Sequence, residues 1–323
     1  MRAFSLTAVP SVEDAVQRSR PGSAYLAGAT TLVDLMKLEV LHPNDVVDIN
    51  ALPLRGITVS ADGVRIGALE RMSDVAAHPH IAAQYPVIAQ ALLRSASQQI
   101  RTMASIGGNL LQRTRCGYYR DVTTPCNKRE PGSGCPALAG GNRMHAVLGT
   151  SKSCVATHAS DLAVALIALD VSLRLYSDAG TRTVRLADFY LLPGETPDLE
   201  HDLRPGELIT EVLVPPLDWA SRSVYLKIRD RESYEFALCS AAVALDVRDG
   251  VIADARIALG GVGTVPWRMR AVEAALRGAR AGEAAFVAAA EQAADGMKLL
   301  SDNGFKATLA TRTIVRALLS LEV

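Results

Sequence analysis

Hydrophobic positions in the first two thirds of the chain change repeatedly between the two-residue period of strands and the helical period of 3.6 residues. Residues 23–27 have the pattern of a strand, and residues 32–38 follow with apolar side chains at helical spacing. Further strands are predicted at 45–49, 63–68, 171–175 and 182–186, and helices at 11–16, 86–100 and 160–169. Ser11 and Ser160 occupy the positions of helix N-caps.

The last third has a different order, in which strands come first and helices follow. After the proline pair at 215–216, strands are predicted at 223–228, 241–247 and 251–259, with Asp249-Gly250 as a hairpin turn. Helices are then predicted at 267–278, 282–293 and 306–320. Strands followed by helices indicate an antiparallel sheet with helices on one face, so the whole chain is expected to be α+β. The expected domains are 1–217 and 218–323.

The composition narrows the class of protein. Of 323 residues, 49% are apolar, and 34 Lys and Arg balance 34 Asp and Glu, which is typical of a globular protein. Balanced charge gives no reason to expect a nucleic acid or a membrane surface as a partner. No apolar run approaches the roughly 18 residues of a transmembrane helix, and the first residues lack the apolar core of a secretion signal. We therefore expect a cytoplasmic protein, or one that a partner carries elsewhere.

Four of the five cysteines lie close together in the sequence, at Cys116, Cys126, Cys135 and Cys154. They are separated by nine, eight and eighteen residues, which is neither the two-residue knuckle of common zinc sites nor the short ferredoxin run. The intervening Gly- and Pro-rich sequence predicts a long irregular loop, which metal ligation would help to order. Seven basic side chains from Arg113 to Lys152 face two acidic ones, which favours thiolates.

These observations leave disulfides, zinc and an iron–sulfur cluster as alternatives for the four cysteines. His145 and His158 lie near them and could replace one thiolate, although surface or core packing is the more common role of a lone histidine. Cys239 stands in an apolar run and is expected to be a buried core residue. No Ser-His-Asp or paired-carboxylate spacing indicates a hydrolase.

Two glycine-containing turns are candidate ligand sites. Residues 28–31 connect a predicted strand to a helix, where backbone N–H groups can converge on a phosphate, but an ordinary turn has the same sequence pattern. Residues 105–109 follow a predicted helix, so their glycine pair could be a helix C-cap or could let the backbone approach a flat ligand. Neither turn has the GxGxxG pattern of a Rossmann fold.

Together, the segments Leu26–Leu32, Ser105–Asn109 and Ser160–Leu162 resemble the FAD-binding subunit of molybdenum hydroxylases, the xanthine dehydrogenase family. The resemblance covers essentially the whole chain. The cysteine segment, at about 112–155, resembles the insertion that binds an extra [4Fe-4S] cluster in some members, most closely the flavin subunits of bacterial periplasmic-type aldehyde oxidoreductases. The compartment would then be the cytoplasm, or the periplasm if a signal-bearing partner exports the chain.

The resemblance implies an FAD-binding domain of the vanillyl-alcohol-oxidase type, with two α/β subdomains that hold FAD between them, followed by a C-terminal sheet-plus-helices domain. The implied cofactor-binding residues are Leu26, Ala27, Gly28, Ala29, Thr30, Thr31, Leu32, Ser105, Ile106, Gly107, Gly108, Asn109, Asp161 and Lys227. The first turn would bind the pyrophosphate and the second would lie against the flavin. Cys116, Cys126, Cys135 and Cys154 would bind the cluster. Ala29 departs from the family, where many members have a second glycine.

The favoured hypothesis for function is an electron-transfer subunit of a three-subunit aldehyde oxidoreductase. A large molybdenum-cofactor subunit would oxidise the substrate, a small [2Fe-2S] subunit would deliver electrons to FAD on this chain, and an external acceptor would take them. A stand-alone FAD-dependent reductase or oxidase is the alternative enzyme. A zinc-stabilised binding module is the non-enzymatic alternative.

Overall fold

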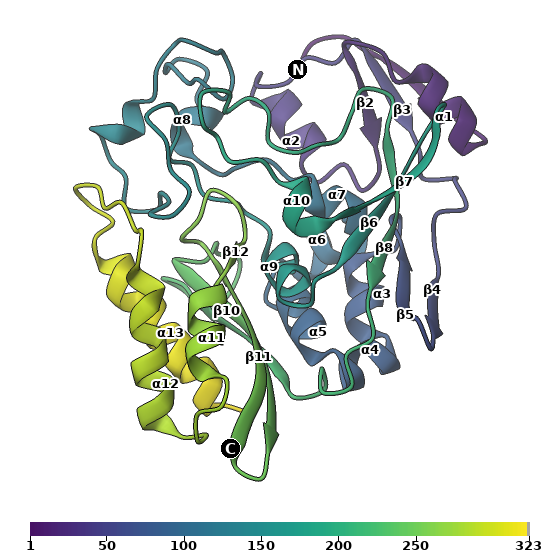
Figure 1. Ribbon diagram of the computed structural model, residues 1–323. Coiled ribbons are helices and arrows are strands. Elements are labelled where there is room, and N and C mark those ends of the chain that lie inside the picture. The colour runs from purple at the N-terminus through teal and green to yellow at the C-terminus, as the bar shows by residue number, and fades with distance from the viewer. Residues whose placement is uncertain (322–323) are drawn as a thin grey trace.

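The computed structural model describes residues 1–321, and its strands form three sheets (Figure 1). The first sheet is parallel, in the order β1 (Ser5–Ala8), β3 (Asp45–Asp48) and β2 (Ser23–Leu26). Consecutive strands that run parallel in one sheet require a crossover. α1 (Val12–Arg18) supplies it between β1 and β2, and α2 (Leu32–Lys37) supplies it between β2 and β3. β1 was not predicted, because its alternation of polar and apolar residues extends over only four positions.

The second sheet is antiparallel and contains five strands. Their order is β4 (Ile57–Ser60), β5 (Gly63–Gly67), β8 (Leu208–Val214), β6 (Ser172–Ser177) and β7 (Gly180–Arg185). β8 was missed at the sequence level, yet it is the central strand. The buried helices α3 (Met72–Ala77), α5 (Pro86–Leu93) and α9 (Asp161–Ala168) share one hydrophobic core with this sheet.

The predicted helix over 86–100 is wrong in its extent, because two helices occupy this region. α5 ends at Leu93, and α6 (Gln98–Met103) begins after Ser97, whose hydroxyl accepts a hydrogen bond from the Ile100 N–H at 3.3 Å. Between them Ala96 has a φ of 47°, a left-handed conformation that cannot continue a helix. The shorter helices of this part are α4 (Pro79–Gln84), α7 (Ile106–Leu110) and α10 (Leu186–Phe189).

The third sheet belongs to the last hundred residues and has the antiparallel order β12 (Trp267–Arg268), β11 (Val251–Gly260), β10 (Cys239–Arg248) and β9 (Ser223–Ile228). α11 (Arg270–Leu276) and α13 (Phe305–Leu319) pack on one face, and α12 (Glu283–Ala290) lies against α13. The predicted α+β architecture is therefore confirmed. The other face is not open to solvent, since α5 packs on β9 and α9 packs on β10 and β11.

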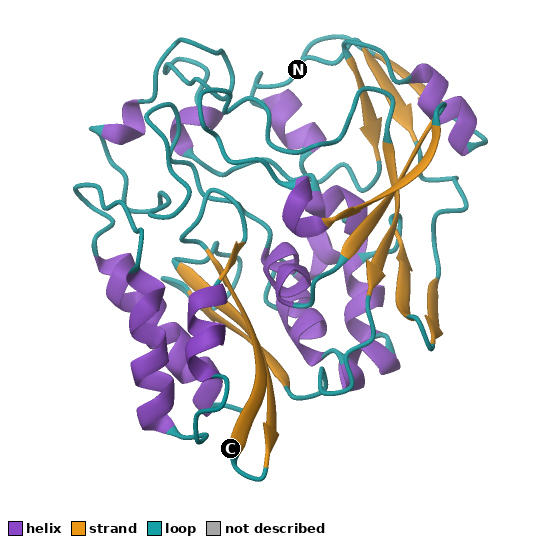
Figure 2. Ribbon diagram, viewed as in Figure 1, coloured by secondary structure: helices purple, strands orange, loops and turns teal. Residues whose placement is uncertain are grey.

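The cysteine segment, residues 112–155, is the most irregular part of the structure. Loops dominate it in Figure 2, at the upper left, and its only helical elements are α8 (Gly117–Arg120) and the 3-10 turn Pro136–Leu138. The segment carries its own hydrogen bonds. The Arg129 guanidinium donates to the carbonyls of Tyr118 and Tyr119, at 3.0 and 2.7 Å. Local contacts therefore contribute to the order of this loop.

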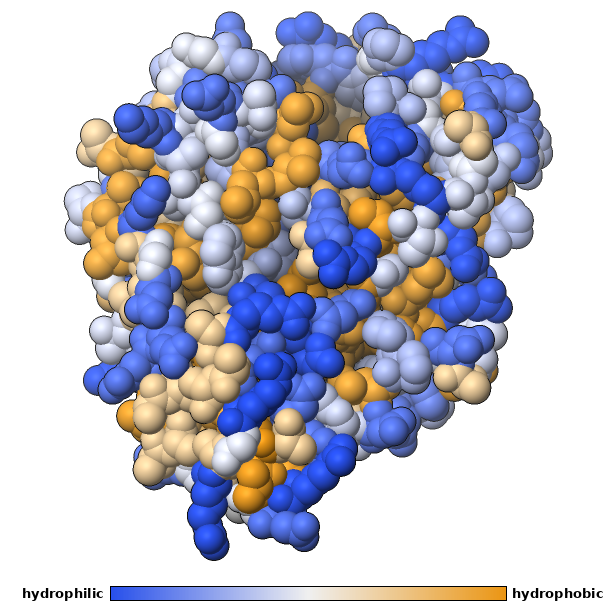
Figure 3. Space-filling view, in the orientation of Figure 1, coloured by the Kyte–Doolittle hydropathy of each residue, from blue (hydrophilic) through white to orange (hydrophobic). Residues whose placement is uncertain are grey.

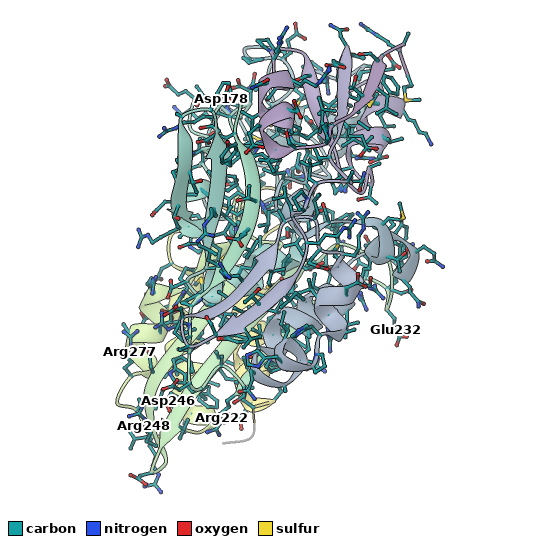
Figure 4. All side chains as sticks on the ribbon, turned by 90° about the vertical axis from the view of Figure 1, so that its right-hand side faces the viewer. Asp178, Arg222, Glu232, Asp246, Arg248 and Arg277 are labelled. Carbon is teal, nitrogen blue, oxygen red and sulfur yellow. The ribbon has the colours of Figure 1, made fainter. Side chains whose placement is uncertain are left out.

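The surface agrees with the balanced composition. Figure 3 shows hydrophilic and hydrophobic side chains interspersed over one face of the molecule. Figure 4 places Asp178, in the turn between β6 and β7, and Arg248, at the end of β10, toward opposite ends of the molecule.

Within residues 1–321, no helix combines the length and the apolar character that crossing a membrane requires.

Candidate functional site

The turn between β2 and α2 presents backbone donors to a cavity. Ala29 has a φ of 61°, so it occupies the left-handed region that favours glycine, which explains why a glycine suits this position. The N–H groups of Thr30 and Thr31 have no hydrogen-bond partner among the described residues, and both residues line the cavity wall. Unpaired backbone donors beside a helix start are suited to an anion.

Gly28 brings this first turn against the second. A Cβ atom at Gly28 would lie 2.1 Å from the carbonyl oxygen of Met103 and 2.8 Å from the Cα of Ala104. Met103 and Ala104 lead directly into Ser105, the N-cap of α7. The missing side chain of Gly28 therefore allows the two glycine turns, about eighty residues apart in the sequence, to pack backbone against backbone.

Alanine at Gly28 is expected to destabilise the fold by about 3 kcal/mol, at the upper end of overpacking costs, because the clash is with backbone that has little freedom to move. The matched control is Gly117→Ala, where a Cβ would meet nothing within 4 Å. Chemical denaturation measures the free energy of unfolding of both variants. Equal stabilities for the two variants would contradict the contact between the turns.

The second turn differs from its expected form, because its glycines lie in the helical turn α7 rather than in a C-cap. The Gly107 N–H donates to the Ala68 carbonyl at 2.8 Å, and the Gly108 N–H donates to the Ser105 hydroxyl at 3.2 Å. A Cβ at Gly107 would lie 3.0 Å from the Cβ of Ala68. The N–H groups of both glycines are already used, so these two residues offer a ligand a close backbone surface rather than free donors.

The two turns border a pair of joined cavities that share Thr30, Thr31 and Gly108. One cavity, of about 220 Å³, is mainly apolar and extends to Tyr25, Leu35, Leu208 and Ile209. The other, of about 570 Å³, is more polar and extends to Asp161 and Lys227. We call the two together the cleft. An elongated cleft with one apolar end, a central set of backbone donors and one polar end suits a long cofactor with unlike ends.

Asp161 and Lys227 meet at the polar end of the cleft and form an ion pair of 2.8 Å. Both side chains are buried, with 8% and 1% of their surface exposed. The Tyr225 hydroxyl and the Ser95 hydroxyl also donate to Asp161, at 2.6 and 3.1 Å, and Lys227 donates to the Arg94 carbonyl at 3.1 Å. Burial, and then the Asp161 charge, raise the pKa of Tyr225 well above its usual value.

The fold explains how residues so far apart in the sequence come together. Asp161 is the first residue of α9, and α9 packs on the face of the C-terminal sheet whose edge strand β9 carries Lys227. The Ser160 hydroxyl caps this helix by accepting from the Ala163 N–H at 3.0 Å. The pair was not predicted at the sequence level, where each residue was assigned to the cofactor separately.

The four cysteines of the segment line one small cavity, whereas Cys239 is buried in β10. The cavity measures about 10 Å³, so a cluster would require the loop to open around it. The thiol of Cys116 lies 3.2 Å from Nε2 of His145, which also lines the cavity. Within the described part of the chain, no three His, Cys, Asp or Glu side chains form a group that could hold one metal ion.

Burial is the main influence on the acidity of three of these thiols. It raises the pKa of Cys116 to about 11 and raises the pKa values of Cys135 and Cys154, while the charge of Lys128 acts in the opposite direction on Cys154. His158, whose ring lies edge-on to Tyr190, has its pKa lowered to about 3, first by burial and then by Lys128. Burial therefore favours the neutral thiol at Cys116, Cys135 and Cys154.

Most of the positive charge in the cysteine segment is paired with acids from elsewhere in the chain. Arg113 and Lys128 pair with Glu200, and Arg143 pairs with the exposed Asp230 at 2.7 Å. Arg115 and Arg120 pair with Asp34 on α2. The excess of basic residues counted in the sequence is thus largely neutralised in the fold, and it is a weaker indication of thiolates than the count suggested.

Several residues of the cleft were missed at the sequence level. Ser95 and Ala96 reach it through the break between α5 and α6, and Phe236 through the loop after β9. Tyr225 carried a usable signal, because it lies two residues before Lys227 on a strand and must share its face. The apolar end contains Leu208 and Ile209 of the unpredicted strand β8.

Comparison with known protein families agrees with this geometry. The family described as FAD binding domain in molybdopterin dehydrogenase matches residues 2–217, and the CO dehydrogenase flavoprotein C-terminal domain matches residues 224–321. The chain is an FAD-binding medium subunit of the molybdenum hydroxylase family. The resemblance seen in the sequence is confirmed.

The relatives of this FAD-binding subunit include an aldehyde oxidoreductase. The aldehyde oxidoreductase FAD-binding subunit PaoB of Escherichia coli is 46% identical, over 98% of both chains. The glyceraldehyde dehydrogenase medium chain of Sulfolobus acidocaldarius is 29% identical, over 84% of this chain and 79% of the relative. A solved structure of carbon monoxide dehydrogenase from Hydrogenophaga pseudoflava superposes with a TM-score of 0.76 at 25% identity, covering 99% of this chain and 97% of that one.

Proposed function

We propose that this subunit carries FAD and a [4Fe-4S] cluster in a molybdenum-dependent aldehyde oxidoreductase, where it passes electrons from an iron–sulfur subunit to an external acceptor. The observation that carries the proposal is the cleft, in which free backbone donors at Thr30 and Thr31 connect an apolar end to a polar one. FAD, when bound, would supply redox chemistry that no protein side chain provides.

The residues of the cleft fit the parts of FAD in order. Leu208, Ile209 and Tyr25 would surround the adenine at the apolar end. Thr30 and Thr31 would donate backbone hydrogen bonds to the diphosphate, and Gly107 and Gly108 would let the cofactor lie close to the backbone. Asp161 and Lys227 would hold the polar edge of the flavin, since their ion pair keeps both side chains in place at this end of the cleft.

Cys116, Cys126, Cys135 and Cys154 would bind the [4Fe-4S] cluster. Each iron of such a cluster takes one thiolate, so the four sulfurs must surround a common space rather than meet at one point. The shared cavity supports this arrangement, and Cys239 lies outside it. Lys128 also lines the cavity, and its positive charge would favour an anionic centre.

The partners would be a large molybdenum-cofactor subunit and a small [2Fe-2S] subunit. Support comes from the names of the relatives, which are subunits or medium chains. The cytoplasm and the periplasm would both suit such an assembly.

The purified subunit is expected to oxidise no aldehyde by itself, because the molybdenum centre that would activate the C–H bond belongs to the proposed large subunit. Its absorption spectrum should combine flavin bands with a broad iron–sulfur shoulder, and co-purification should recover the two partners. Flavin bands alone, together with turnover by the isolated chain, would favour a stand-alone flavoenzyme. A colourless protein with bound zinc would refute both.

A further inference from the structure

Two arginines of the cysteine segment reach into the FAD cleft. Arg115 and Arg120 line its polar cavity together with Thr30 and Thr31. Both are held by one carboxylate, Asp34 on α2. Arg120 donates to its two oxygens at 3.0 and 2.8 Å, and Arg115 donates to one oxygen at 3.1 Å. Asp34 lies one helical turn beyond the Thr30–Thr31 turn, so this ion-pair cluster adjoins the free backbone donors.

The charges around this cavity do not cancel. Its charged side chains are four cations and three anions, which leaves one positive charge in excess. Asp161 pairs with Lys227, and Glu235 pairs with Arg231. The remaining anion, Asp34, faces two guanidinium groups. The excess charge therefore belongs to the pair of arginines.

Both guanidinium groups also retain unused donors. Arg115 Nε and Arg120 Nη1 are buried and have no hydrogen-bond partner among the described residues. Arg115 is held in place from its other side by Phe236, whose ring lies 5.4 Å from the guanidinium carbon. A buried, unpaired donor on a charged group is costly, and a multiply charged oxyanion relieves that cost.

We propose that Arg115 and Arg120, positioned by Asp34, complete the binding site for the diphosphate of FAD. This inference rests on the proposed function, in that FAD occupies the cleft. Oxidised flavin is neutral, whereas the diphosphate is the anionic part of the cofactor, and planar guanidinium donors match phosphate oxygens. The cysteine segment is then part of the FAD site and not only a carrier of thiols.

The test is ligand binding by the full chain after its flavin has been removed, with ADP, FAD and riboflavin as separate probes. Arg115→Gln and Arg120→Gln should each weaken ADP and FAD binding about tenfold or more, the effect of losing a charged hydrogen bond, and leave riboflavin binding unchanged. Added salt should weaken ADP binding more steeply in the wild type than in either variant. Arg143→Gln is the matched control, since Arg143 belongs to the same segment but pairs with Asp230 outside the cleft.

A second variant separates charge from structure. Asp34→Asn keeps an amide oxygen that can accept hydrogen bonds from the guanidinium groups and so position them, but it removes the negative charge, so ADP should bind as tightly as in the wild type or more tightly. If the cluster served only to clamp the segment to α2, Asp34→Asn would weaken ADP binding as the arginine variants do, and the inference would be overturned. Unchanged ADP affinity in the arginine variants would also overturn it. A wild-type chain that binds no FAD would instead refute the proposed function.

Discussion

Serine in place of Cys116, Cys126, Cys135 or Cys154 is expected to remove most of the iron from the purified subunit. Each thiolate would be the protein ligand of one iron, and a serine hydroxyl replaces it poorly, so each change opens an iron site to solvent. Iron and acid-labile sulfide per chain, measured with the absorption spectrum, give the result directly. Flavin content should be largely retained, because no cysteine of the segment lines the polar or the apolar cavity of the cleft.

The control is Cys239→Ala, a buried position on β10 that should leave iron unchanged. His145 needs its own variant because its Nε2 atom lies 3.2 Å from the thiol of Cys116. His145→Ala should retain the cluster. If one cysteine variant kept its full iron and His145→Ala lost iron, the imidazole of His145, and not that thiolate, would be the fourth ligand. Iron loss in the Cys239 variant would overturn the assignment.

Removal of one member of the Asp161–Lys227 pair is expected to destabilise the subunit by about 3–5 kcal/mol and to lower bound flavin. In Lys227→Met the Asp161 carboxylate remains buried without its counter-ion. In Asp161→Leu the Lys227 ammonium group remains buried without its counter-ion. The double variant should be more stable than the less stable single variant, because no charge is then left unpaired. Denaturant unfolding measures the free energy of unfolding of each variant, and the amount of flavin bound per chain shows whether the cleft still binds the cofactor.

The exposed pair of Arg143 and Asp230 is the control for these changes, since both side chains are about half exposed. Neutralising either should alter stability by about 0–1 kcal/mol. Similar effects at the two pairs would contradict the view that the burial of Asp161 and Lys227 decides their importance.

The sequence predicted those parts of the fold whose cause is local. Asp249 and Gly250 have φ values of 53° and 75°, as the predicted hairpin turn requires, and Ser160 caps α9 as expected. β8 escaped detection although it is central, because its pairing with β5 and β6 depends on residues that lie far from it in the sequence. The break at Ala96 also escaped, because an alanine in the left-handed conformation leaves no mark on the hydrophobic pattern.

The candidate site also has a part that the local sequence predicts and a part that depends on distant residues. The first glycine turn could be located from its strand and helix, and its residues do line the cleft. The use of the donors in the second turn could not be foreseen, since the partner of Gly107 is a carbonyl nearly forty residues earlier, at Ala68. The pairing of Asp161 with Lys227 spans 66 residues and follows only from the packing of α9 on the third sheet.

The position of α9 has a consequence for the incomplete chain during its synthesis. All eight of its residues are buried, and part of that surface is covered by β10 and β11, which the ribosome adds about eighty residues later. Until β10 and β11 have been synthesised, one apolar side of α9 in the FAD-binding part therefore remains uncovered. Nascent chains in that state are prone to aggregation. β10 and β11 cover this apolar surface once they are synthesised and folded. The cleft beside Asp161 is completed only after β9, which carries Lys227, has been added.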